Sequence, residues 1–403
     1  MSHLFRPTLR LPNLRRFAVV SFVAAAAVLP LADARPAWAA QDVPNLSARI
    51  RGSEEPVAFR NEIDAFLDYH VSRLLGDDPV AVGQAREALS NQVGDQQATI
   101  SFKNLYADLL VNRLQRAAAN EATFNQLNIA IVAERLARLT GSTRLGPLIT
   151  TLAEDDDAQV ALWAAQAAQP IFPELLSAAG SGDTNRLTRA MVESVKRFPG
   201  NGPLAEDVYE TLSMRITEAR PPSRAVLERG ASTVVPALHD LMAFRTGLVT
   251  PSAPAPHPRA ELPALVLIVH PFTWPVQTQE QKTATVVRLR DLMVRLAETA
   301  GNMEGDPRRE VIEVLTRIGS GFETISGPTV PNGPPQLPEL YPAAQQLRRA
   351  PPTVAQRQLE EYVAGIVDAL ASTYPDLPAP QLASQPDAGG PDTQPTQPAA
   401  GGN

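Results

Sequence analysis

Helical periodicity is the feature that most limits what this chain can fold into. Between residues 56 and 246, apolar side chains recur every three or four positions, as in the series Phe59, Ile63, Phe66 and Leu74. This spacing places them on one side of an α-helix. Alternating strand-like patterns are almost absent there, and Gly, Asp, Asn and Pro occupy the positions where helices begin and end. The pattern predicts an all-α fold.

Several helix boundaries follow from local residues alone. Asp78 followed by Pro79 predicts a helix start, because an aspartate caps free N–H groups and a first-turn proline has no N–H to leave unbonded. Gly141 predicts a helix end. Thr278 predicts the start of a long helix that ends at Gly301.

A weak repeat runs through the helical region. Three segments share an acidic or amide turn followed by an alanine-rich amphipathic helix, and they begin near Asp77, Asn120 and Asp156. The first two starts lie 43 residues apart and the last two 36. The clearest unit is 144–168, in which a leucine-containing helix, an acidic turn and an alanine-rich helix follow one another. Over roughly residues 77–200 the chain resembles HEAT-type helical repeats.

The resemblance implies an irregular α-solenoid, in which paired helices stack on their neighbours and expose extended surfaces for protein partners. The chain departs from the family pattern in two places. Ala81 and Ala161 stand where such repeats often carry an arginine, and the next candidate turn, at Gly182, comes early. A non-repetitive helical bundle is the alternative.

The first 39 residues have the order of a secretory signal peptide. Four arginines precede an apolar run over 17–31, and a small-x-small site follows at Ala37 to Ala39. The run of about fifteen residues is shorter than the roughly 18–20 that span a bilayer. We therefore expect cleavage after Ala39 and a periplasmic or extracellular protein. An uncleaved membrane anchor is the alternative, and the export route, general or twin-arginine, stays open.

Removing this leader makes the chain more acidic. The formal net charge is −7, and residues 1–39 contain five arginines and one aspartate, so the remainder carries −11. An acidic chain is a poor match for a phosphate backbone, so no nucleic-acid partner is expected. No later segment has 18 uninterrupted apolar residues, so no integral membrane segment is expected in the mature chain.

The chain divides into six predicted regions. They are a signal peptide (1–39), an N-terminal linker (40–55), a helical repeat domain (56–246), a proline-rich linker (247–263), a smaller, mainly helical unit (264–373) and a disordered tail (374–403). The run Leu265–Val269 is compatible with either a buried strand or a short core helix, because periodicity does not separate them at that length.

The sequence offers little for catalysis or metal binding. There is no cysteine, which excludes disulfides, thiolate sites and a lipid anchor on cysteine. The four histidines after the leader, at 70, 239, 257 and 270, are far apart in sequence, and motifs for hydrolases, phosphate loops and dinucleotide binding are missing. No cofactor, metal or catalytic residue is therefore predicted.

Two features are candidates for contact with a partner. The contiguous acids Glu154, Asp155, Asp156 and Asp157 fit a solvated turn between helices, but they also suit recognition of a basic partner. As a calcium site they lack alternating ligands and a glycine. Trp274, in an aromatic–proline turn, either holds that turn against the core or acts as a binding hot spot.

Two classes of function remain. The first is an exported, non-enzymatic scaffold or binding protein with a protein partner. The alternative is an extracytoplasmic hydrolase or lyase that uses paired carboxylates on a helical scaffold. The sequence identifies neither the partner nor the oligomeric state.

Overall fold

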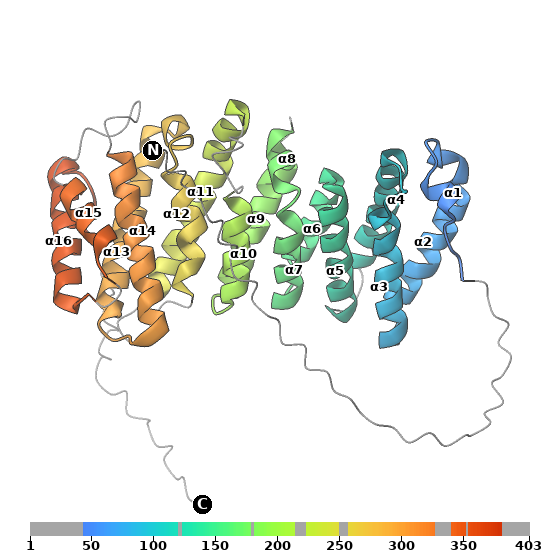
Figure 1. Ribbon diagram of the computed structural model, residues 1–403, viewed down its shortest axis with the longest axis horizontal. Coiled ribbons are helices and arrows are strands. Elements are labelled where there is room, and N and C mark those ends of the chain that lie inside the picture. Colours follow the sequence, from blue (N-terminus) through green and yellow to red (C-terminus); the bar gives the residue numbers. More distant parts are fainter. Residues whose placement is uncertain are drawn as a thin grey trace, which may run out of the picture. The chain divides into compact units, whose positions relative to one another are not determined.

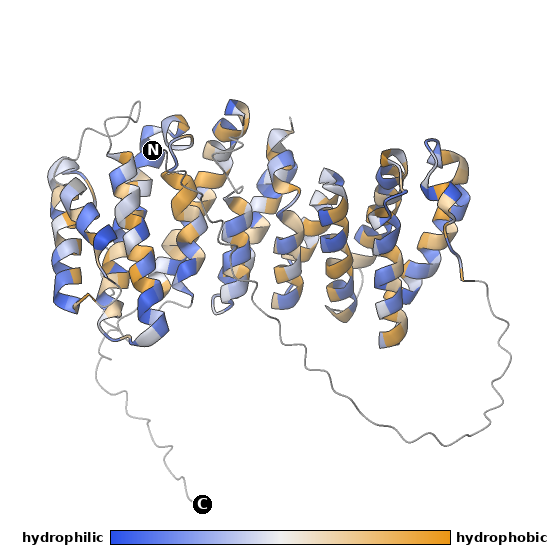
Figure 2. Ribbon diagram, in the orientation of Figure 1, coloured by the Kyte–Doolittle hydropathy of each residue, from blue (hydrophilic) through white to orange (hydrophobic). Residues whose placement is uncertain are grey.

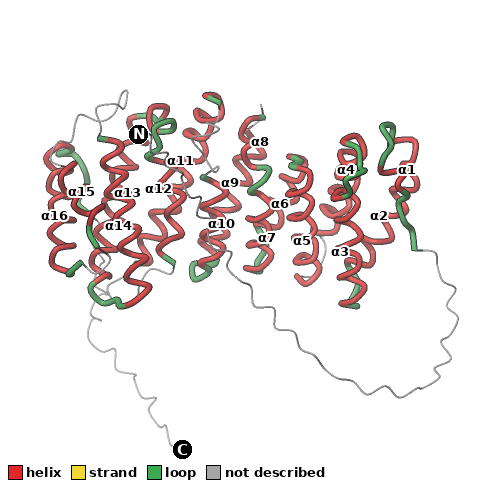
Figure 3. Tube along the Cα trace, in the orientation of Figure 1, coloured by secondary structure: helices red, strands yellow, loops and turns green. Residues whose placement is uncertain are grey.

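The computed structural model describes residues 43–119, 123–178, 181–213, 223–249, 257–326, 340–351 and 354–380. The predicted signal peptide and most of the predicted tail lie outside these residues. Within them every regular element is a helix and no strand occurs (Figure 3). The predicted all-α class is therefore confirmed for the described chain.

Sixteen α-helices and four short 3₁₀ helices follow one another in the described residues. The α-helices of the first part are α1 (Ala48–Arg51), α2 (Arg60–Leu74), α3 (Pro79–Gly94), α4 (Ile100–Ala118), α5 (Thr123–Thr140), α6 (Gly146–Ala153), α7 (Ala158–Ala168) and α8 (Phe172–Ser177). Those that follow are α9 (Ser181–Arg197), α10 (Gly202–Leu212), α11 (Arg224–Leu248), α12 (Leu262–Ile268), α13 (Gln279–Ala300), α14 (Gly305–Ile325), α15 (Leu340–Arg349) and α16 (Gln356–Thr373). The 3₁₀ helices are η1 (Pro56–Phe59), η2 (Thr143–Leu145), η3 (Pro258–Glu261) and η4 (Trp274–Val276).

Most helices belong to one of two rows, within which each helix contacts the next (Figure 1). The first row consists of α2, α4, α6, α9, α11, α13 and α16. The second row consists of α3, α5, α7, α10, η3 with α12, α14 and α15. Contacts such as α2 with α3, α6 with α7 and α13 with α14 join the rows, so that consecutive helices form pairs.

The core lies between the two rows. Leu67 of α2, Leu89 of α3, Leu110 of α4 and Leu136 of α5 are at most 1% exposed, and they continue the periodic pattern seen in the sequence. Apolar and hydrophilic stretches alternate along the helices (Figure 2), as expected for amphipathic helices that bury one side. Small residues such as Ala164 and Ala168 of α7 are fully buried and allow close helix packing.

The predicted helix boundaries are confirmed at three places. Asp78 caps α3 by accepting a hydrogen bond from the Val80 N–H at 3.0 Å. Thr278 and Gln281 form a reciprocal capping box at the start of α13, which ends before Gly301. Gly141 follows α5 with φ of 61°, a left-handed conformation that glycine adopts without steric cost.

The predicted linker at 247–263 is helical at both ends. The helix α11 extends to Leu248, and η3, which begins at Pro258, leads directly into α12. Pro258, Ala260 and Glu261 are buried, and η3 with α12 lies between α10 and α14 in the second row. The apolar run is a helix rather than a strand, because its neighbours on both sides are helices.

The two flanking regions also differ from their predictions. In the predicted N-terminal linker, Leu46 and Ile50 are buried and α1 is formed. In the predicted tail, Leu377 packs against the core and the Pro378 carbonyl accepts a 2.6 Å hydrogen bond from Arg290. The N-terminal segment adds apolar side chains to the core, and the C-terminal segment adds one apolar side chain and a carbonyl that accepts a hydrogen bond. From Pro44 onward the described residues belong to one compact unit.

None of the described helices combines the length and apolar character needed to cross a bilayer.

Candidate functional site

Two neighbouring hollows open on the first row of helices. The first hollow has a volume of about 500 Å³ and lies among α4, η2, α6, α8 and α9. It is lined by Asp108, Val111, Asn112, Gln115, Thr143, Arg144, Pro147, Leu175, Ala178, Asp183 and Thr184. The second hollow has a volume of about 380 Å³ and lies between α9 and α11. Only α9 separates the two, so they form a continuous candidate surface.

The acids of the first hollow are each paired with an arginine. Arg144 of η2 bonds to Asp108 of α4, and Arg186 lies 2.6 Å from Asp183 within α9. A carboxylate neutralised in this way is a poor general base. The remaining polar lining is mostly amide and hydroxyl groups, which both donate and accept hydrogen bonds.

A lysine links the helices on either side of the second hollow. Lys196 of α9 donates to Glu193 at 2.9 Å and to Asp240 of α11 at 2.7 Å. The hydrogen bond to Asp240 is the main cause of a raised pKa at Lys196, so this lysine stays charged. The hollow is also lined by Asn185, Thr188, Arg189, Val192, Ser232, Thr233, Pro236 and Ala237.

The second hollow contains two polar groups without their usual partners. Thr188 is 3% exposed, and its hydroxyl has no hydrogen-bond partner among the described residues. Pro236 stands inside α11 and has no N–H, so the carbonyl of Ser232 lacks the usual i to i−4 bond. A donor–acceptor hydroxyl and a backbone acceptor thus line the same hollow.

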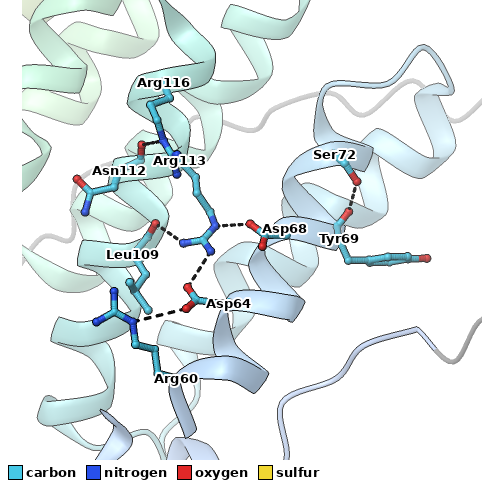
Figure 4. Close-up of polar contacts among 9 residues, drawn as sticks. All are labelled: Arg60, Asp64, Asp68, Tyr69, Ser72, Leu109, Asn112, Arg113 and Arg116. Atoms are coloured by element: carbon cyan, nitrogen blue, oxygen red, sulfur yellow. Dashed lines mark hydrogen bonds and ion pairs between the residues drawn. The ribbon is translucent and has the colours of Figure 1, made fainter.

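Between α2 and α4, an arginine clamp holds the adjoining part of the first row together (Figure 4). Arg113 of α4 donates to Asp68 and to Asp64 of α2, both at 2.7 Å, and to the Leu109 carbonyl at 3.1 Å. Arg60 lies 3.6 Å from the second oxygen of Asp64. All three nitrogens of the Arg113 guanidinium donate hydrogen bonds within the protein, so this group holds α2 and α4 together.

The predicted acidic turn joins α6 to α7 and is tied to α9. Asp157 caps α7 by accepting from the Gln159 and Val160 N–H groups, and Asp155 accepts from the Asp157 N–H at 2.8 Å. Burial raises the pKa of Asp155.

Arg197 of α9 donates to the backbone carbonyls of Glu154 and Asp155 and lies 3.7 Å from the Asp156 carboxylate. Because Glu154 and the Asp156 side chain face solvent, they are the acids of this turn that remain open to a partner. The turn's interpretation as a recognition loop stays a prediction.

Trp274 lies away from solvent. Its side chain is fully buried, with the Lys282 ammonium 5.7 Å from the ring centroid. A side chain in this position holds the turn before α13 against the core, and it contacts no partner without a rearrangement. The structure therefore favours the packing interpretation of this tryptophan over the hot-spot interpretation.

The histidines do not converge. His70 is buried and packs its ring 4.4 Å from that of Phe66, and burial lowers its pKa. His270 lines a third hollow, of about 380 Å³, between α12 and α14. In the described residues no group of three His, Asp or Glu side chains is arranged to hold a metal ion.

His239 of α11 begins a buried hydrogen-bonded chain. Its Nε2 lies 2.8 Å from the Thr285 hydroxyl, which donates to Gln277, whose amide donates to the Ile268 carbonyl at 2.7 Å. Since the Thr285 proton is used toward Gln277, His239 is the donor at Nε2. Burial lowers the pKa of His239 to about 4. The chain ties α11, α12 and α13 together.

Sequence reasoning missed the hollows and the groups that line them. One signal was available, since a proline within a helical pattern frees the carbonyl four residues earlier. Compared with protein-family models and with curated proteins, the chain shows no match.

Proposed function

We propose that this chain is an exported, non-enzymatic helical scaffold that binds an extended segment of a partner protein. The segment lies along the first row, across the hollows that flank α9. Stacked HEAT-like helix pairs provide that surface, and the predicted leader directs the chain to the periplasmic or extracellular side.

A recurring sequence separation supports the repeat. Polar contacts between helices join residues that are 41 to 50 positions apart in many places along the chain. Examples are Arg113 with Asp64 (49), Lys196 with Asp240 (44), Thr211 with Ala165 (46), His239 with Thr285 (46) and Arg308 with Val354 (46). HEAT units are about 40–47 residues long, and most of these separations fall within that range, which supports the proposed repeat.

The observation that carries the proposal is a buried Thr188 hydroxyl without a partner at the second hollow, which is also lined by Ser232, whose carbonyl lacks its helical bond because of Pro236. A buried hydroxyl without a partner costs about 1–3 kcal/mol, so a ligand that bonds to Thr188 after a small shift of its side chain would recover that energy. The Ser232 carbonyl freed by Pro236 supplies an acceptor nearby. An extended polypeptide offers alternating N–H and C=O groups. Its N–H can donate to the Ser232 carbonyl, and either group can bond to the Thr188 hydroxyl.

The lining of the hollows favours a peptide over a compact metabolite. Pockets for small molecules are mostly apolar, whereas the second hollow is mainly polar and the first is about equally polar and apolar. The paired state of Asp108 and Asp183 also weakens the hydrolase alternative, because neither acid in the first hollow is left to move a proton.

Site-specific cross-linking tests where the partner binds. A photoreactive residue at Asn185, which lines the second hollow, should capture one discrete protein in the extracytoplasmic fraction. The matched position is Glu206, which is exposed on α10 of the second row and should capture none. Equal capture from both positions would contradict the proposed surface.

Affinity measurements with the purified captured partner test the mechanism. Thr188→Val should weaken binding by roughly tenfold, equivalent to about 1.4 kcal/mol, without lowering the free energy of unfolding. Thr211→Val is the control, because its buried hydroxyl is bonded to the Ala165 and Asp207 carbonyls. That variant should lose stability and keep the affinity. Unchanged affinity in Thr188→Val would disprove the role of the hydroxyl.

A further inference from the structure

The helix α13 carries a buried arginine that no group in the described chain neutralises. Arg295 is 7% exposed, and its Nε and Nη1 atoms are inaccessible to solvent and have no hydrogen-bond partner. Arginine stays charged at all relevant pH values. A buried, unpaired charge is unfavourable, so an arginine in this position normally has a counter-charge.

A second arginine lies on the same side of the helix. Arg288 precedes Arg295 by seven residues, which is close to two helical turns, and its buried Nε also lacks a partner. Arg288 is near enough to His239 of α11 to contribute to the lowered pKa of that histidine. Both arginines therefore lie on the part of α13 that is turned toward α11.

Two acids lie within about one turn of these arginines along the helix, Asp291 and Glu298, and no ion pair joins either of them to Arg288 or Arg295. Asp291 lies between the two arginines in sequence, but its Oδ1 accepts from Arg290 at 3.0 and 2.7 Å. Arg290 in turn donates to the Pro378 carbonyl, so all three of its guanidinium nitrogens are bonded and Asp291 balances its charge. Neither Arg288 nor Arg295 forms an ion pair with any described residue.

We propose that Arg295 and Arg288 form an oxyanion-binding site on α13, on the side that faces α11. Its ligand is a small carboxylate or phosphate group. A guanidinium presents paired N–H donors that match the oxygens of both groups, and low exposure strengthens the interaction. Arg295 supplies the buried donors, and Arg288 is the less buried of the two. The site needs no protein partner, so its test is independent of the proposed function.

Thermal unfolding of the full chain at constant ionic strength tests the site. Inorganic phosphate replacing chloride should raise Tm with a saturable dependence in the native chain, and Arg295→Met should abolish the saturable part. Non-specific salt effects raise Tm in both proteins alike and do not saturate. Acetate in place of phosphate distinguishes the two sources, because a carboxylate site responds to acetate and a phosphate site responds mainly to phosphate.

A second measurement separates ligand binding from a structural role. In chloride alone, Arg295→Met should leave Tm unchanged or raised, because an unpaired buried charge is removed. Arg290→Met, which removes a fully bonded arginine from the same helix, should lower it. Arg288→Gln should fold normally and weaken the response to the anion. A response equal to the native one in Arg295→Met, or no saturable response to either anion in the native chain, would overturn the proposal.

Discussion

At the residue scale, the fold depends on single positions with an unusual backbone conformation or a very close contact. His257 adopts a left-handed backbone with φ of 51°, and its imidazole lies over Gly202 at the start of α10. The His257 carbonyl accepts a 3.2 Å hydrogen bond from Arg245. These contacts hold His257, the residue before η3, against α10 and α11.

Gly202 should not tolerate a side chain. A Cβ there would lie 1.7 Å from the His257 ring, so Gly202→Ala forces the imidazole to move and should lower the free energy of unfolding by about 1–3 kcal/mol. Gly247→Ala is the matched control, since it lies in α11 with no atom near the added carbon, and it should be stabilising by roughly 0.5–1 kcal/mol. Chemical denaturation measures both. Equal stability of the two variants would refute the contact.

His239 should make stability depend on pH. Its folded-state pKa of about 4 lies below the ordinary value of 6.5, so the unfolded chain binds this proton more readily. The contribution is complete above about pH 6.5 and is lost as pH falls toward 4, on the order of 3 kcal/mol in total.

The comparison of two variants at pH 7 and pH 4.5 isolates this effect. His239→Gln should show a smaller loss of stability between the two pH values than the native chain does. Thr285→Val removes the hydroxyl partner and keeps the buried imidazole, so it should retain the native pH dependence. The same loss in His239→Gln as in the native chain would rule out this histidine as the cause.

At the element scale, ion pairs join helices that are adjacent within a row or across rows. Their contribution to the free energy of unfolding depends on how buried they are. Arg113 binds two acids of α2 from α4, with 13% of its side chain exposed. Arg245 of α11 and Glu261 of η3 form a pair that is 3% and 4% exposed. Glu261 belongs to the predicted linker, so the buried pair ties the helical end of that proline-rich stretch to α11.

Breaking the buried pair should cost far more than breaking an exposed one. Glu261→Gln leaves the Arg245 charge buried without its carboxylate and should destabilise the fold by about 3–5 kcal/mol. Glu313→Gln removes the exposed partner of Arg259, where both side chains are nearly half exposed, and should cost about 0–1 kcal/mol. Denaturant midpoints with an unchanged slope provide the comparison. A small effect of Glu261→Gln would show that the pair is not needed.

At the scale of the whole molecule, the two rows continue through the boundary predicted between a repeat domain and a second unit. The segment formed by η3 and α12 contacts α10 on one side and α14 on the other. The histidine-centred chain of hydrogen bonds also joins α11 to α13. The second unit therefore shares its core with the first.

Separated pieces should not fold independently. Residues 264–380 expressed alone would lack η3, which packs against α14, and also α10, α11 and the Arg245–Glu261 pair. We expect this piece to show no cooperative thermal transition by circular dichroism, whereas residues 44–380 show one. Cooperative unfolding of the isolated piece at the temperature of the longer chain would contradict a shared core.

The sequence by itself determined the helical class and many helix ends, because these depend on local geometry. Local patterns extend over only a few turns of one helix, so they can be recognised in the sequence alone. Examples are the apolar spacing of Ile63, Phe66 and Leu74 and the caps at Asp78 and Thr278. The acidic turn at 154–157 was likewise correctly placed between two helices.

Only the tertiary structure decided what the helices place together. Trp274 looked the same in sequence whether exposed or buried, and packing against neighbouring helices buries it. The hollow containing Thr188 and Pro236 joins α9 to α11, and the unpaired state of Arg295 depends on which acids Arg290 already binds. These are contacts between residues far apart in the chain or choices among competing partners, and no local pattern specifies them.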